Sequence, residues 1–138
     1  MCALSRRSAL AVFAGAVSGP IVPALATHEH TLFLNVAFAM RQRAIETGDQ
    51  PFGAVVVRNG DVIGYGPSRV VTKHDPNAHA EREAIRDAQV MLNRTDLTDC
   101  VLYSTSRPCA VCEKAAYDAR ISRMFYGRDA TDAGPPRQ

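Results

Sequence analysis

Apolar residues recur with a helical period in two stretches of the chain. Residues 31–47 carry apolar side chains at three- and four-residue steps, and Gly48 follows as a stop signal. Residues 78–92 repeat this spacing with three alanines and Met91. Positions three and four apart share one face of a helix, so each stretch is predicted to form an amphipathic helix that covers a core.

Two β-rich runs lie between these predicted helices. Residues 52–57 and 62–65 are separated by a turn that contains Asn59 and Gly60. The dipeptide Asn-Gly favours the positive φ angles of a two-residue type I′ hairpin turn. The two runs are therefore predicted to pair as antiparallel strands, and the polar residues 68–77 that follow are expected to form a loop.

The last third of the chain predicts a strand, a helix and a second strand. The strands are residues 100–104 and 121–126, and residues 109–119 form the helix between them. A β-helix-β passage needs a crossover connection, so we expect these two strands to be parallel. The resulting order αββαβαβ indicates an α/β domain with a mixed sheet. Residues 132–138, which include two prolines, are predicted to fray.

The first residues have the features of an export leader. Arg6 and Arg7 precede an uncharged apolar stretch, and residues 24–26 provide a small-x-small cleavage site. The apolar stretch is interrupted by prolines and is shorter than the roughly 20 residues of a membrane anchor, so a retained anchor is the weaker interpretation. The arginine pair resembles a twin-arginine signal. We therefore expect an export signal over 1–26, a domain over 27–138 without a membrane span, and a periplasmic or otherwise exported protein, or a cytoplasmic one if the leader is not used.

Composition and charge narrow the classes of partner. The 138 residues are 46% hydrophobic and 22% charged, which fits one globular domain. The formal net charge is +2, and the leader supplies two of the 16 basic residues and none of the 14 acidic ones. The neutral remainder disfavours a nucleic-acid partner. A domain of this size gains stability from a bound metal or a second subunit, so we expect a homodimer.

Two short motifs bring metal-binding residue types to helix starts. His79 and Glu81 open the second predicted helix, and Pro108, Cys109 and Cys112 open the third. Residues three apart lie on one helix face, so the two cysteines can point at one ion. One histidine and two cysteines make three protein ligands, the number that a catalytic zinc uses when its fourth position stays open. The motifs predict one zinc ion per chain.

Glu81 lies two residues from the predicted ligand His79. A carboxylate at that distance can take a proton from an attacking water and return it to a leaving group. The alternatives are a carboxylate that only stabilises the helix start and, for Cys109 and Cys112, a redox pair or a disulfide in an oxidising compartment. The upstream His-x-Glu motif favours zinc over a redox pair.

The complete arrangement of motifs resembles the cytidine-deaminase-like superfamily, and within it the guanine deaminase and tRNA adenosine deaminase group. Three blocks carry the resemblance: residues 51–54 (Pro-Phe-Gly-Ala), residues 74–81 (His-Asp-Pro-Asn-Ala-His-Ala-Glu) and residues 107–112 (Arg-Pro-Cys-Ala-Val-Cys). The resemblance implies a three-layer α-β-α fold around a mixed sheet, one zinc per active site, and hydrolysis of an exocyclic amine on a nucleobase.

Matched residue by residue, the resemblance implies zinc ligands at His79, Cys109 and Cys112 and a catalytic proton shuttle at Glu81. It also implies five residues that contact or border the base: Phe52, Gly53, Ala54, Ser68 and Asp132.

The chain departs from the group's pattern at three points. Ser68 stands where the group usually has an asparagine that holds a ring or ribose oxygen, and Arg107 replaces the usual glutamate before Pro-Cys. The chain also stops where relatives add further helices, so the expected domain is C-terminally short. Asp132, within Thr-Asp-Ala, matches a substrate-contacting aspartate of the guanine deaminase branch.

These inferences predict a zinc-dependent hydrolase that removes an exocyclic amine from a guanine-like purine base or a related aminated heterocycle and releases ammonia. The alternatives are an enzyme that resembles tRNA adenosine deaminases, and a degenerate zinc-binding deaminase fold without turnover.

Overall fold

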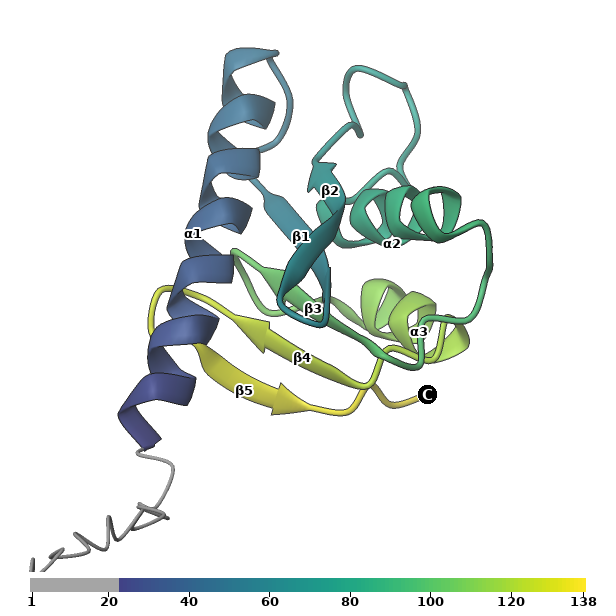
Figure 1. The fold of residues 1–138 in the computed structure, drawn as a ribbon. Coiled ribbons are helices and arrows are strands. Elements are labelled where there is room, and N and C mark those ends of the chain that lie inside the picture. The colour runs from purple at the N-terminus through teal and green to yellow at the C-terminus, as the bar shows by residue number, and fades with distance from the viewer. Residues whose placement is uncertain (1–22) are drawn as a thin grey trace, which may run out of the picture.

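The computed structural model describes residues 23–138, with side chains from residue 27 onward. Helix α1 lies against one face of a five-stranded sheet, and α2 and α3 lie against the other (Figure 1). The elements are α1 (Pro23–Glu46), β1 (Gly53–Arg58), β2 (Asp61–Pro67), α2 (Ala80–Leu92), β3 (Cys100–Ser104), α3 (Ala110–Asp118), β4 (Arg123–Tyr126) and β5 (Thr131–Gly134). The predicted α/β class with three layers is confirmed. The predicted leader falls mainly on residues that lie outside the described part of the chain.

The sheet has the strand order β2-β1-β3-β4-β5. Strands β3 and β4 are parallel, as the crossover predicted, and the other neighbours are antiparallel. Asn59 and Gly60 have φ angles of 48° and 80°, which confirms the predicted hairpin turn. Gly53 pairs with Pro67, and the next residue of β1 pairs with Ser104. The start of β1 and the ends of β2 and β3 therefore meet at one end of the sheet.

Strand β5 corrects the predicted frayed tail. Thr131–Gly134 pairs antiparallel with β4 after a turn in which Gly127 and Ala130 adopt positive φ angles of 75° and 51°. Farther on, the backbone N–H of Arg137 donates to Glu113 of α3 at 3.1 Å. A four-residue strand is too short to show an alternating pattern, and the adjacent prolines suggested a break. The sequence pattern therefore missed the pairing.

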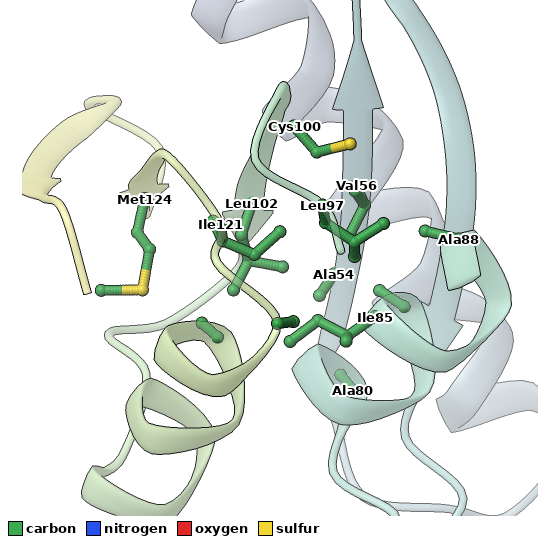
Figure 2. Close-up of a cluster of buried hydrophobic side chains, with 13 residues drawn as sticks. Ala54, Val56, Ala80, Ile85, Ala88, Leu97, Cys100, Leu102, Ile121 and Met124 are labelled. Carbon is green, nitrogen blue, oxygen red and sulfur yellow. The ribbon is translucent and has the colours of Figure 1, made fainter. Parts of the chain in front are cut away.

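Apolar clusters lie on both faces of the sheet. The cluster between the sheet and helices α2 and α3 is drawn in Figure 2, and it includes Ala54 and Val56 of β1. Val55 and Val57 of the same strand belong to the second cluster, under α1. All four side chains are at most 5% exposed. Because successive side chains of a strand point to opposite faces, β1 is a central strand buried on both sides.

Close contact between β2 and α2 fixes the start of that helix. A Cβ atom added to Gly66 would lie 2.0 Å from the carbonyl oxygen of Ala80, and one added to Gly64 would lie 2.3 Å from that of Ala84. Only glycine permits this approach of helix backbone to strand. The first turn of α2 is therefore held directly against the end of β2.

Helix α1 begins at Pro23, earlier than the predicted residue 31. The polar residues 28–30 interrupt the apolar spacing without ending the helix, which is why the pattern placed the start too late. Within residues 23–138, no helix has an apolar stretch long enough to cross a membrane.

Candidate zinc site

The three predicted ligands meet where α2 and α3 begin. His79 and Cys109 occupy the N-cap positions of α2 and α3, and neither side chain forms a capping hydrogen bond, so both are available as ligands. Cys112 lies in the first turn of α3. The His79 Nδ1 atom is 3.8 Å from the Cys109 Sγ and 3.4 Å from the Cys112 Sγ, and the three ligand atoms all lie within 4.8 Å of one another.

These separations fit zinc. Tetrahedral ligands at about 2.3 Å for sulfur and about 2.0 Å for nitrogen lie about 3.5 Å apart, close to the two observed sulfur-to-nitrogen distances. Two thiolates would neutralise a divalent cation, and an imidazole with two thiolates is a donor set that zinc prefers. Three protein ligands leave one tetrahedral position for water or substrate.

The surroundings of Cys112 disfavour its thiolate form in the absence of a cation. The residue is fully buried, and both this burial and the neighbouring Glu81 carboxylate raise the pKa of its thiol above the ordinary value. A thiol in this environment stays protonated at neutral pH unless a positive charge stabilises the thiolate. Cys109 and Cys112 are free thiols in the structure, not a disulfide. The buried sulfur therefore suits a metal ligand better than a reactive redox thiol.

Glu81 stands in the first turn of α2, directly beside these ligands. It is 7% exposed, and burial raises the pKa of its carboxyl above the ordinary value, against the opposing effects of a backbone hydrogen bond, Cys112 and His79. A buried carboxyl near the zinc ligands has the position required of a group that accepts and returns a proton.

A cavity of about 280 Å³ opens onto this cluster. It is bounded by the start of β1, the end of β2 and the starts of α2 and α3. Its lining residues are Gln50, Phe52, Ser68, His79, Ala80, Glu81, Ser106, Arg107 and Cys109. The end of the sheet therefore forms one wall and the zinc ligands form another.

Two of the five predicted base-contacting residues line the cavity, namely Phe52 and Ser68. Ala54 is fully buried in the core on β1. Gly53 approaches α1 so closely that an added Cβ would lie 2.1 Å from the carbonyl oxygen of Ala37. Gly53 and Ala54 thus hold the strand that carries Phe52, and the structure does not place either of them among the cavity's lining residues.

Asp132 also lies outside the lining of this cavity. It belongs to β5, where its carboxylate accepts a 2.7 Å hydrogen bond from the guanidinium of Arg123 on β4. Hydrogen bonding to Arg123 lowers the pKa of the Asp132 carboxyl below its ordinary value. The predicted contact between Asp132 and substrate stays a prediction.

The sequence pattern did not reveal Asp49, a buried carboxylate next to the cavity. Burial alone would raise its pKa, but hydrogen bonds from the backbone and side chain of Thr72, the Gln50 backbone and the Ser68 hydroxyl lower it well below the ordinary value. The available signal was an aspartate between the helix-ending Gly48 and the first strand, which a single sequence does not distinguish from a solvated turn residue.

Comparisons with known proteins agree with this geometry. The family profile described as the cytidine and deoxycytidylate deaminase zinc-binding region matches residues 27–128. A guanine deaminase of Bacillus subtilis is 42% identical over 105 residues, which cover 75% of this chain and 67% of the relative. A tRNA-specific adenosine deaminase of Aquifex aeolicus is 39% identical over 94 residues, which cover 68% of this chain and 62% of the relative.

Solved structures give the same result. The Bacillus subtilis guanine deaminase structure matches with a TM-score of 0.69 at 41% identity, over 71% of this chain and 63% of the other. A second structure, 26% identical with a TM-score of 0.67 over 70% of this chain and 55% of the other, is a complex with 2,6-diaminopurine. The chain spans about two thirds of the length of the curated relatives it matches. It belongs to the zinc-dependent deaminase family defined by the cytidine and deoxycytidylate deaminase zinc-binding region.

Proposed function

We propose that the protein is a hydrolytic deaminase of a free purine base, guanine or a close analogue, and that it releases ammonia. The observation that carries this proposal is the position of Glu81, a carboxyl buried in the same small cavity as the ligands His79 and Cys109. A deaminase requires this combination of an open zinc position and an adjacent proton carrier.

The residues divide the chemistry between them. A zinc ion held by the three ligands would act as a Lewis acid and lower the pKa of water. Glu81 takes a proton from the attacking water as its oxygen adds to the ring carbon that bears the amine, and the π electrons of the ring C=N bond move to the ring nitrogen until the amine leaves. Glu81 then gives that proton to the amine nitrogen, the carbon–nitrogen bond breaks, and ammonia leaves. Phe52, whose side chain is 41% exposed at the cavity, offers an aromatic surface to the heterocycle.

The size of the cavity supports a base over a larger ligand. Its volume of about 280 Å³ lies just below the roughly 300–1,000 Å³ of drug-sized ligand pockets. Solved relatives were captured with the purine analogues 8-azaguanine and 2,6-diaminopurine. A free purine therefore matches both the space in this chain and the ligands of its relatives.

The second candidate is deamination of adenosine in tRNA. It is supported by a solved tRNA:A34 deaminase that is 38% identical over 71% of this chain, with a TM-score of 0.69. The formally neutral charge of residues 27–138 argues against it, because RNA binding rests on contacts between basic side chains and phosphates.

Ammonia release from guanine, adenine, cytosine, cytidine and an adenosine-containing tRNA stem-loop tests the proposal, with zinc per chain measured on the same samples. We expect turnover of guanine by the wild-type protein. In the Glu81→Gln variant we expect retained zinc and a loss of at least about 10³-fold in kcat, because the proton carrier is removed. Glu46→Gln on the exposed side of α1 is the matched control.

The results separate the candidates. Turnover of the stem-loop but not of free bases would favour the tRNA enzyme. A zinc-loaded protein that turns over none of these compounds would favour the degenerate fold. A Glu81→Gln variant as fast as the wild type would overturn the proton-carrier role.

We also propose that residues 1–26 direct export through the twin-arginine route. Arg6 and Arg7 before an apolar stretch support this proposal. Expression in a bacterium followed by intact mass measurement of the periplasmic fraction tests it. We expect a product that lacks residues 1–26, and we expect the Arg6→Lys, Arg7→Lys double variant to remain in the cytoplasm at full length.

A further inference from the structure

We propose that Ser68 offers only a hydrogen-bond acceptor to the base cavity, because its hydroxyl donates to the buried Asp49 carboxylate, and that this wall selects ligands with an N–H group at that point. The inference rests on the proposed function and names a specificity determinant of the same cavity. Ser68 would contact the base, and Asp49 would act through Ser68 as a positioning residue.

Hydrogen-bond donors surround the carboxylate of Asp49. One oxygen accepts the Gln50 backbone N–H at 2.8 Å and the Ser68 hydroxyl at 3.0 Å. The other accepts the backbone N–H groups of Val71 and Thr72 at 3.1 and 2.8 Å and the Thr72 hydroxyl at 2.9 Å. Five donors favour the ionised carboxylate, which has no proton of its own to donate.

The hydroxyl of Ser68 has a single proton. Because the Asp49 carboxylate can only accept, the hydroxyl must donate to it, and the Ser68 oxygen keeps only its lone pairs for other partners. Ser68 is 1% exposed and lines the base cavity together with Phe52. The backbone N–H of Ser68 also donates to the Phe52 carbonyl oxygen at 3.0 Å, which fixes both residues on one wall.

The orientation of the Ser68 hydroxyl has a consequence for the ligand. An acceptor-only oxygen on a desolvated wall binds a ring N–H or an exocyclic amine. A ring nitrogen lone pair at the same point would face the serine oxygen without a proton between them. An asparagine at this position would present both a donor and an acceptor. The serine and its buried aspartate therefore make the wall more restrictive than an asparagine would.

The experiment compares guanine with 1-methyl-, 7-methyl- and 9-methylguanine, each of which removes one ring N–H. The zinc-loaded wild type, Ser68→Ala and Asp49→Asn proteins are measured for kcat/KM and for equilibrium binding. For the wild type, we expect kcat/KM and affinity to be at least tenfold lower for one or more of the methyl derivatives than for guanine. In Ser68→Ala, kcat/KM and affinity for guanine should fall to the values that the wild type shows for that derivative.

Asp49→Asn tests the positioning role specifically. An asparagine amide that donates to Ser68 turns the serine proton toward the cavity, so the preference should shift from the N–H ligand toward ligands with a ring acceptor. A merely structural role would lower activity on all four bases equally. Asp61→Asn, an exposed aspartate at the hairpin turn, is the matched control and should leave the preference unchanged.

The inference is overturned if Ser68→Ala retains the wild-type order and magnitude of preference. It is also overturned if Asp49→Asn changes kcat/KM for all four bases by the same factor while zinc content and circular dichroism stay at wild-type levels. Absence of guanine turnover in the wild type would contradict the proposed function instead. The binding measurements would then decide the Ser68 inference independently of turnover.

Discussion

The two walls of the cavity beside the zinc ligands are built in different ways. The zinc wall comes from the starts of α2 and α3, which lie on the same face of the sheet and bring His79, Cys109 and Cys112 together. The second wall lies at the end of β2, where the Ser68 hydroxyl donates to Asp49 in the loop between α1 and β1. The first wall needs rigid helices and a cation, and the second needs one buried carboxylate. We therefore expect substitutions at Ser68 to leave the metal ligands in place.

The largest effect on the zinc site is expected from Cys112→Ser. The serine hydroxyl is a poor zinc ligand, and the remaining pair His79 and Cys109 leaves too few protein ligands for a catalytic zinc. We expect zinc content to fall well below one ion per chain and activity to fall at least about 10³-fold. Elemental analysis and ammonia release measure the two effects.

Cys100→Ala is the matched control for that loss. Cys100 is a fully buried free cysteine of the core at the start of β3, and it is not part of the ligand cluster. Its replacement should retain zinc and cost about 1 kcal/mol of unfolding free energy, as the loss of a small buried group does. Loss of zinc from Cys100→Ala would contradict the assignment of the metal ligands.

A substitution on β2 is also expected to disturb the zinc site. In Gly66→Ala, the added Cβ would meet the Ala80 carbonyl oxygen, so α2 must shift away from β2. We expect about 1–3 kcal/mol of destabilisation from overpacking and a weaker zinc site, because His79 immediately precedes the shifted turn. Urea unfolding and competition with a zinc chelator test the prediction. An unchanged zinc affinity would show that the ligand geometry does not depend on this contact.

The contrast between the walls also explains what the sequence could predict. The sequence identified the three ligands because zinc requires particular residue types, here His79, Cys109 and Cys112. It identified the hairpin because Asn59 and Gly60 favour positive φ angles. Asp49 was missed because its role depends on donors that arrive from residues 68–72 only after folding. Strand β5 was missed for a related reason, since its pairing with β4 has no periodic signal in four residues.

The ionised state of Asp49 can be tested through the pH dependence of the free energy of unfolding. The folded pKa of Asp49 is lowered, so ionisation stabilises the fold at pH values above the unfolded pKa of about 3.9. This stabilisation is lost as pH falls through the unfolded value and below. We expect Asp49→Asn to lose about 2 kcal/mol relative to the wild type at pH 7, and the difference to shrink toward pH 3. Urea unfolding at several pH values measures it, and a difference independent of pH would contradict the ionised carboxylate.

The smallest effect is expected at Asp132, which lies outside the lining of the cavity. Its carboxylate pairs with Arg123 on the exposed surface between β4 and β5, and exposed ion pairs contribute little to stability. Since this chain places Asp132 outside the lining of the cavity, we expect Asp132→Asn to leave kcat/KM for guanine within about twofold and to lower the melting temperature only slightly. Arg123→Gln, which breaks the same ion pair from the other side, should match it in both measurements. A tenfold fall in kcat/KM for Asp132→Asn alone would instead support the substrate contact that the sequence resemblance implies, and it would mean that β5 supplies a third wall to the cavity.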